Sequence, residues 1–306
     1  MSQSSEVWRY KLIRCAGVIG TSLSVGTFLS HPSWPTPDKI FVFLLCVFTA
    51  FGNGWQLFKR LGPFVALLLV YESFRGLVPH LNTRVDYTIL PAIDRWLGFG
   101  QLPTVRMQGW LWNGSLQWFD FILYGTYMLH FVLPVSLALW IWRTRESYYW
   151  RYIYSYLVVS FSGFIVFLLF PASPPWLASD KGIIEPVTRI SSSVWSAFGI
   201  QDFPSLYNRI SPNPVAAMPS LHAAYATLFF LFVYKLYDRR WSYVAALYPL
   251  LIYIGTIYQG EHYAIDEIVG ALFAVFAFWI TPKIIAAAKP MLIALSQALK
   301  STFRLT

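Results

Sequence analysis

Charged residues are scarce in this chain of 306 residues: Asp, Glu, Lys and Arg together make up 12%, about half of their share in a typical soluble domain. Cysteine is scarcer still. Cys15 and Cys46 both lie inside apolar stretches, so the sequence offers neither a disulfide framework nor the spacing of a zinc site. The apolar stretches are continuous and do not alternate, which argues against an outer-membrane barrel. These shortages exclude a soluble enzyme, a disordered chain and a disulfide-bonded scaffold.

Hydrophobic residues make up 57% of the chain and aromatic residues 19%. A membrane-spanning helix needs about 20 mostly apolar residues, and the sequence predicts eight such spans, at 11–29, 39–57, 62–79, 118–141, 150–170, 219–236, 242–260 and 263–282. The predicted fold class is therefore all-α, a polytopic membrane protein. We expect two N-terminal transmembrane helices in 1–61, a six-helix core in 62–282 and a basic cytoplasmic tail in 283–306.

The distribution of charge predicts the orientation. With eight spans, both termini lie on one side of the membrane, and the long connections 80–117 and 171–218 lie on the other. The side with the termini holds 15 basic and 3 acidic residues, against 8 and 11 on the opposite side. The positive-inside rule then places both termini in the cytoplasm. The net charge of +9 thus reflects topology, and no nucleic-acid partner is expected. The first span has no convincing cleavage site, so we expect it to be retained.

His222 follows Pro219 and Ser220 at the start of the sixth predicted span, on the side of the long connections. Proline suits the first turn of a helix, because its missing N–H would have no partner there. Free N–H groups and the helix dipole make such an end suitable for an anion such as phosphate. The alternative is a capping serine beside an interfacial histidine.

His262 and Asp266 open the eighth predicted span, within the stretch 258–266, and their i, i+4 spacing places them on one helix face. An aspartate one turn away can hold one ring nitrogen as N–H and leave the other free as a nucleophile. A surface His–Asp pair is the alternative. Asp266, however, lies in an apolar run, where an ionisable group is a functional candidate.

Glu72 and Arg75 lie near the end of the third predicted span, again on the side of the long connections. They form either a structural i, i+3 ion pair or part of a phosphate site, because guanidinium binds phosphate in a bidentate fork. His130 falls in the middle of the fourth span and is either a hydrogen-bonded packing residue or part of a site.

These motifs together predict phosphoryl-transfer chemistry, which needs a nucleophile with its orienting group, an acid and a cation. The histidines lack the spacing of a metal cage, so we expect no metal and no other cofactor.

The motifs Ser220-Leu221-His222 and His262-x3-Asp266 resemble the second and third signatures of the type-2 phosphatidic acid phosphatase superfamily. The resemblance covers roughly 62–282. The stretches 71–76, 171–175 and 217–223 are more similar to its inositol phosphorylceramide synthase-like branch.

In this chain, phosphate ligands of that superfamily are missing from two of its signatures. The Lys and Arg of the first signature are not recognisable, and Thr256 stands where the third signature normally has an Arg. Arg75 is our candidate to replace the missing cations, with Arg209 second. We expect the phosphate and substrate to be bound by Arg75, Ser220, Glu72, Arg209 and Tyr258.

The resemblance implies an enzyme of lipid metabolism: a membrane lipid phosphotransferase or phosphatase that acts on a phospholipid or sphingolipid. His262 would attack phosphorus to form a phosphohistidine, Asp266 would orient it, and His222 would protonate the leaving oxygen. Water, an alcohol or a lipid acceptor would resolve the intermediate. The site would lie on the exoplasmic side of the membrane.

Two alternatives stay open. A plain lipid-phosphate or prenyl-pyrophosphate phosphatase would use the same residues. A lipid transporter or lipid-binding protein would use them as a proton relay, although no internal repeat typical of many transporters is visible. The sequence does not indicate an oligomeric state.

Overall fold

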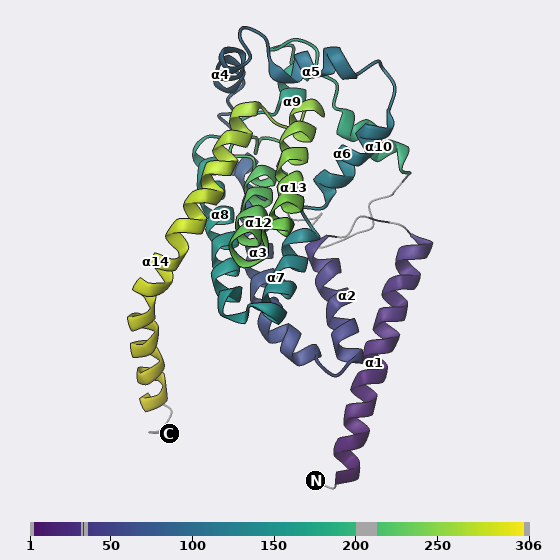
Figure 1. Ribbon diagram of the computed structural model, residues 1–306, viewed down its shortest axis with the longest axis vertical. Helices are drawn as coiled ribbons and strands as arrows, with labels where there is room; N and C mark the ends of the chain where they lie inside the picture. The colour runs from purple at the N-terminus through teal and green to yellow at the C-terminus, as the bar shows by residue number, and fades with distance from the viewer. Residues whose placement is uncertain (1–2, 32, 34–35, 200–212, 303–306) are drawn as a thin grey trace.

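The computed structural model describes residues 3–31, 33, 36–199 and 213–302, and within these ranges the chain forms helices and no named β-strand. Five helices in the described part are long and apolar enough to cross a membrane. They belong to α1 (Gln3–Ser30), α3 (Gly54–Leu81), α8 (Tyr149–Leu169) with the short helix Glu146–Tyr148 before it, α13 (Arg239–Tyr258) and α14 (Ala264–Thr302). The predicted all-α polytopic membrane fold is confirmed (Figure 1).

A helix or a helix pair lies at each of the eight predicted spans, but three differ from a continuous span of about 20 residues. The helix α2 (Pro37–Ala50) has 14 residues and α12 (Leu221–Leu236) has 16. The span predicted at 118–141 is instead a pair, α6 (Trp118–Met128) and α7 (Leu133–Thr144), bent by 52°. Counted as one span, this pair brings the candidates in the described residues to six.

The break between α6 and α7 has a local cause. Pro134 lies in the first turn of α7, where its ring would clash with the carbonyl group four residues earlier if one helix ran through. That carbonyl belongs to His130. The chain makes tight turns from Leu129 to Val132 instead, with hydrogen bonds such as His130 N–H to the Tyr127 carbonyl at 3.3 Å. The break therefore takes His130 out of regular helix in the middle of the membrane segment.

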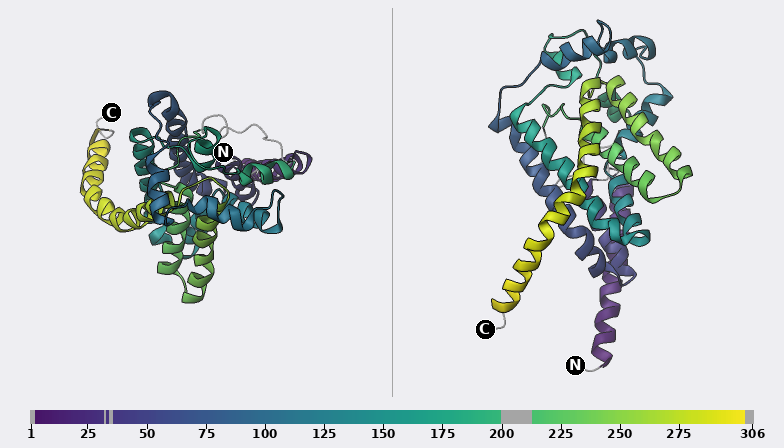
Figure 2. Two further views of the ribbon diagram at one scale, coloured as in Figure 1. Left: turned by 90° about the horizontal axis from the view of Figure 1, so that it is seen from above. Right: turned by 60° about the vertical axis from the view of Figure 1, so that its left-hand side comes forward.

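The long connections carry short helices: α4 (Ile89–Leu97), α5 (Pro103–Leu111), α9 (Pro175–Asp180) and α10 (Ile190–Ala197). Figures 1 and 2 show these helices at one end of the bundle, and the N- and C-termini at the other.

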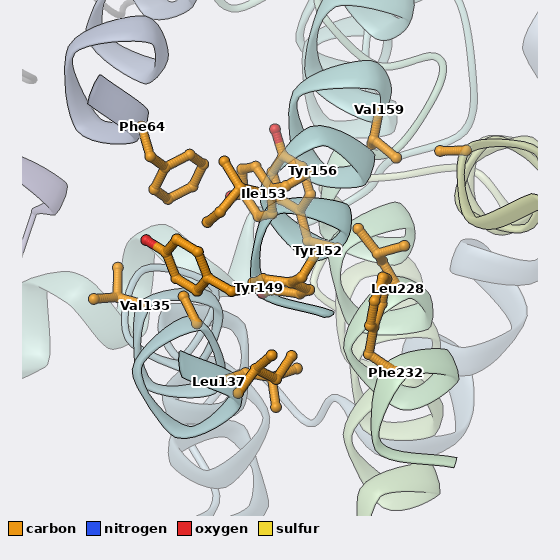
Figure 3. Packing of buried hydrophobic residues seen from close by; sticks show 14 of the residues in the cluster. Phe64, Val135, Leu137, Tyr149, Tyr152, Ile153, Tyr156, Val159, Leu228 and Phe232 are labelled. Atoms are coloured by element: carbon orange, nitrogen blue, oxygen red, sulfur yellow. The ribbon is translucent and has the colours of Figure 1, made fainter. Parts of the chain in front are cut away.

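The core is formed by aromatic and branched side chains of α3, α7, α8, α12 and α14. Figure 3 shows Tyr149, Tyr152 and Tyr156 of α8 between Phe64 on one side and Phe232 on the other. Tyr156 also stacks on Tyr225 of α12 at 4.1 Å between ring centroids. This packing fixes α12 against α8.

The lower half of α14 runs away from the bundle in both figures. Pro282 lies inside this helix, where proline removes a hydrogen bond and bends the axis. Helix α14 continues to Thr302, so the stretch predicted as a tail at 283–306 is helical over most of its length. The predicted boundaries at 61/62 and 282/283 fall inside α3 and α14.

Candidate active site

The start of α12 is held directly against α14. Ser220 caps α12, because its hydroxyl oxygen accepts a hydrogen bond from the Ala223 N–H at 3.2 Å. Its own N–H donates to the Asp266 carbonyl at 3.0 Å. The close approach depends on Gly270, since a Cβ atom there would lie only 2.2 Å from the Ser220 carbonyl oxygen. Ser220 is thus fully buried at the joint of the two helices.

This joint brings the two predicted catalytic histidines into contact. His222 lies in the first turn of α12, and His262 lies in the turn between α13 and α14. Nδ1 of His222 is 3.2 Å from Nε2 of His262, and Nδ1 of His262 is 3.5 Å from Oδ2 of Asp266. The carboxylate favours a proton on Nδ1 of His262, which leaves a lone pair on Nε2. His222 then donates its Nδ1–H to that lone pair.

Asp266 is fully buried, and Oδ2 also accepts a hydrogen bond from the Tyr263 N–H at 2.9 Å. This second contact fixes the carboxylate against the turn that carries His262. Burial lowers the pKa of His262, but the carboxylates of Asp266, Glu267 and Glu261 outweigh it, so the pKa is raised above its ordinary value.

Asp94 of α4 anchors the same turn from the loop layer. Its two carboxylate oxygens accept hydrogen bonds from the Ala264 and Ile265 N–H groups at 3.0 and 2.9 Å, at the N-terminus of α14. Burial raises the pKa of Asp94 to about 6, although these two hydrogen bonds lower it. Nothing in the sequence indicated this role, because 170 positions separate Asp94 from Ala264.

A cavity of about 410 Å³ opens beside the histidine pair, and both histidines line it. Arg75 and Glu72 of α3 line the same cavity and form an ion pair, with Nε of Arg75 2.8 Å from Oε2 of Glu72. The Asn213 amide donates to the Arg75 carbonyl at 2.9 Å. A guanidinium group therefore lies in one cavity with two imidazoles. The cation and the candidate nucleophile that the sequence motifs predict thus share one site.

A third imidazole lines this cavity, from the break between α6 and α7. Nδ1–H of His130 donates to the Tyr127 carbonyl at 2.7 Å, and the His130 ring meets the His222 ring edge-on, with centroids 4.6 Å apart. The Tyr127 ring stacks on His222 as well, with centroids 4.3 Å apart. His130 thus helps to hold His222. The sequence had left open whether His130 is a packing residue or part of a site.

The remaining predicted site residues lie elsewhere. Ser220 and Tyr258 do not line the cavity. Tyr258 is buried in a separate cluster with Leu123 and Ile190. Arg209 lies outside the described residues. Thr256, at the position of the expected arginine, donates its hydroxyl to Oε1 of the buried Glu267 at 2.8 Å.

The connection before α12 is docked onto the catalytic turn through Glu261. Arg189 binds this carboxylate with two nitrogens, at 2.8 and 3.3 Å, and Ser191 donates to it as well. Arg189 also lies over the Trp176 ring at 4.2 Å. Sequence reasoning missed this contact, because neither charge lies in an apolar run.

Comparison with known families identifies the chain. A model of the PAP2 superfamily matches residues 88–280. This range is well over half of the chain, so the protein belongs to the PAP2 superfamily, and the predicted relationship is confirmed.

The curated relatives that match are named as sphingolipid synthases. A phosphoinositol dihydroceramide synthase of Bacteroides thetaiotaomicron is 34% identical over 47% of this chain and 49% of its own length. The inositol phosphorylceramide synthase catalytic subunit aur1 of Schizosaccharomyces pombe is 26% identical over 75% of this chain and 54% of its own. An inositol phosphorylceramide synthase of Candida albicans is 23% identical, over 74% and 48%.

The chain spans about half the length of the curated relatives that it matches. No solved structure matches it significantly.

Proposed function

We propose that this protein transfers a phosphorylated head group from a membrane phospholipid to a lipid alcohol through a phosphohistidine on His262. The contact of His222, His262 and Asp266 at the rim of a cavity that also holds Arg75 carries the proposal. Membership of the PAP2 superfamily supports lipid-phosphate chemistry, and the names of the relatives support an inositol phospholipid as donor and a ceramide as acceptor.

In the first half-reaction, Nε2 of His262 attacks the donor's phosphorus. The bond from phosphorus to the glycerol oxygen breaks, and His222, which starts protonated on both ring nitrogens, delivers its Nδ1 proton to that oxygen and becomes neutral, which releases a diacylglycerol. Asp266 stabilises the imidazole as its positive charge develops. A five-coordinate phosphorus needs more room than the 3.2 Å between the two nitrogens, so the His222 ring rotates away as the substrate binds.

In the second half-reaction, the neutral His222 takes the proton of the acceptor hydroxyl as its oxygen attacks the phosphohistidine. The bond between phosphorus and Nε2 breaks and restores His262. Arg75 binds the non-reacting phosphate oxygens in a fork, and its ion pair with Glu72 holds the guanidinium in the cavity.

Transfer and hydrolysis are separated by one experiment. The purified protein is given phosphatidylinositol and ceramide, and the lipid and water-soluble products are quantified. We expect inositol phosphorylceramide and diacylglycerol in equal amounts. Release of inositol phosphate at the same rate with and without ceramide would assign the protein to the phosphatases. Absence of turnover, with ceramide moved between vesicles, would favour a lipid transporter.

We further propose that the site lies on the exoplasmic side, with both termini in the cytoplasm. The charge asymmetry of the sequence supports this orientation, and so does the position of the loop helices opposite the termini. Cysteines placed at Asn82 and Ser192 should react with an impermeant thiol reagent in intact cells, and a cysteine at Ser147 should not. The reverse pattern would place the site in the cytoplasm.

A further inference from the structure

A second large cavity is lined mostly by residues that precede the segment matching the family model. It measures about 790 Å³, is open on one side, and is bordered by α1, α2 and the first half of α7. Its lining is mainly apolar, with Leu23 and Phe28 from α1, Phe43 from α2, and Val132 and Leu139 from the region of α7. Figure 1 shows α2 between α1 and the rest of the bundle. The N-terminal helices thus add a hydrophobic chamber to the family's core.

This chamber adjoins the catalytic cavity. Val135 of α7 lines both cavities, and Pro37 of the catalytic cavity is followed directly by Asp38 of the chamber. The catalytic cavity, at about 410 Å³, lies near the lower end of the range for drug-sized ligands. It has room for a head group and the reacting bond, so the hydrocarbon chains of two lipid substrates need further space.

The charged residues of the chamber, Asp38 and Lys39, lie at one end with His31 and Ser33, while Ser24, Thr27 and Ser136 lie along its helices. His31, Ser33, Asp38 and Lys39 follow α1 or begin α2, and Nζ of Lys39 donates to the Ser33 hydroxyl at 3.1 Å. The charges of Asp38 and Lys39 cancel, and no arginine is among the described lining residues. Arginine is the residue best suited to phosphate, so this end fits the hydroxyl and amide groups of an uncharged lipid better than a phospholipid head group.

The depth of the chamber fits one lipid chain. Its wall on α7 runs from Val132 to Leu139, which is about 10 Å at 1.5 Å per residue. Half of a bilayer's hydrocarbon core is about 15 Å thick. A chain that enters from the polar end therefore stays in the chamber through most of one leaflet.

We propose that the chamber between α1, α2 and α7 binds a hydrocarbon chain of the acceptor, an uncharged long-chain lipid alcohol, and delivers its hydroxyl to the catalytic cavity. This inference rests on the proposed transfer reaction. It assigns the acceptor to the N-terminal helices and leaves the phospholipid donor to Arg75 and the histidines.

Photocrosslinking tests binding without turnover. The His262→Ala variant is reconstituted in phosphatidylcholine vesicles with a ceramide that carries a diazirine in its acyl chain, and the labelled peptides are identified by mass spectrometry. We expect adducts in 23–28 and 132–139. Adducts confined to Phe64 and Phe167 of the catalytic cavity, or spread over the exposed face of α13, would overturn the proposal. Equal labelling of the chamber by phosphatidylinositol with the same diazirine would also overturn it.

A filled chamber gives a second test. Ser136 lines the chamber and is otherwise exposed, so Ser136→Phe occupies the space without displacing core residues. We expect about tenfold weaker labelling and a KM for long-chain ceramide raised about tenfold, as for the loss of two buried methylene groups, with a smaller change for a short-chain ceramide. Val18→Phe, on the exposed face of α1, is the matched control and should change neither quantity.

The two proposals fail separately. If the wild-type protein forms no inositol phosphorylceramide but the chamber is labelled, the transfer reaction is refuted and the binding site stands. If transfer occurs and Ser136→Phe raises KM equally for long and short acceptors, the chamber is refuted and transfer stands.

Discussion

Gly270 is the residue on which the geometry of the site depends most directly. It lies on α14 one turn after Asp266, where the first turn of α12 crosses. A Cβ atom added here would lie 2.2 Å from the Ser220 carbonyl oxygen and 3.1 Å from Cβ of Ala223. Ordinary contact begins at 3.4 Å. The obstacle is backbone, which cannot turn aside as a flexible side chain could.

Gly270→Ala should therefore separate α12 from α14 by about 1 Å, the difference between 2.2 and 3.4 Å. His222 lies two residues after Ser220 and moves with it, while His262 and Asp266 stay with α14. A misplacement of 1 Å in a catalytic group costs on the order of 10²-fold in rate. Overpacking of this kind also costs about 1–3 kcal/mol of stability, so the protein should still fold.

The assay compares kcat/KM for head-group transfer with thermal unfolding of the same preparation. Gly125→Ala is the matched control, since this helical glycine has no atom within 4 Å of the added Cβ. Alanine there should leave activity unchanged and raise stability slightly. Wild-type activity in Gly270→Ala would refute the reasoning, and so would an activity loss that is fully explained by the fraction of unfolded protein.

Three further predictions concern the chemistry. With a lipid substrate, His222→Ala should lose about 10²–10⁴-fold in rate, because the general acid is missing; with para-nitrophenyl phosphate the loss should be much smaller. His262→Ala should lose both activities. Phosphoenzyme trapped in His262→Ala would reverse the assignment. Neutral His262 is the nucleophile and its pKa is raised, so activity should fall as the pH drops through a value above about 6.5. Glu261→Gln removes a charge that raises this pKa, so it should move this acid limb of the pH–rate profile to lower pH. Arg189→Gln breaks the same ion pair but leaves the negative charge, so it should move the limb to higher pH; shifts of the same sign would contradict this electrostatic account. EDTA should leave the rate unchanged, while vanadate should inhibit; loss of activity on chelation that Mg²⁺ restores would overturn the mechanism.

The sequence predicted the parts of the site that depend on short spacing. His262 and Asp266 lie one helical turn apart, so a helix at this position sets their proximity. The start of α12 could be read from Pro219 and Ser220, and the structure places the helix's first residue at Leu221. The long apolar runs likewise predicted the helices, because burial in a membrane leaves few other backbone structures.

The same reasoning failed where a residue's position depends on distant contacts. Tyr258 ends α13 next to the catalytic turn, but its ring packs against Phe119 of α6 at 6.0 Å between centroids, away from the cavity. The span at 118–141 has enough apolar residues for a continuous helix, and hydropathy does not show where Pro134 ends it.

The position of His130 shows why the break matters for function. In an unbroken helix, the backbone N–H and carbonyl of His130 would be hydrogen-bonded along the axis. The direction of its side chain would then be set by the rotation of the helix at position 130. The turns from Leu129 to Val132 instead place the ring against His222, with Nδ1–H held by the Tyr127 carbonyl. Two contacts therefore position His222: the crossing of α12 and α14 at Gly270, and the ring of His130. A broken helix in a membrane is stable only where its freed backbone groups are shielded from lipid, and here they lie beside the cavity that the proposed chemistry needs.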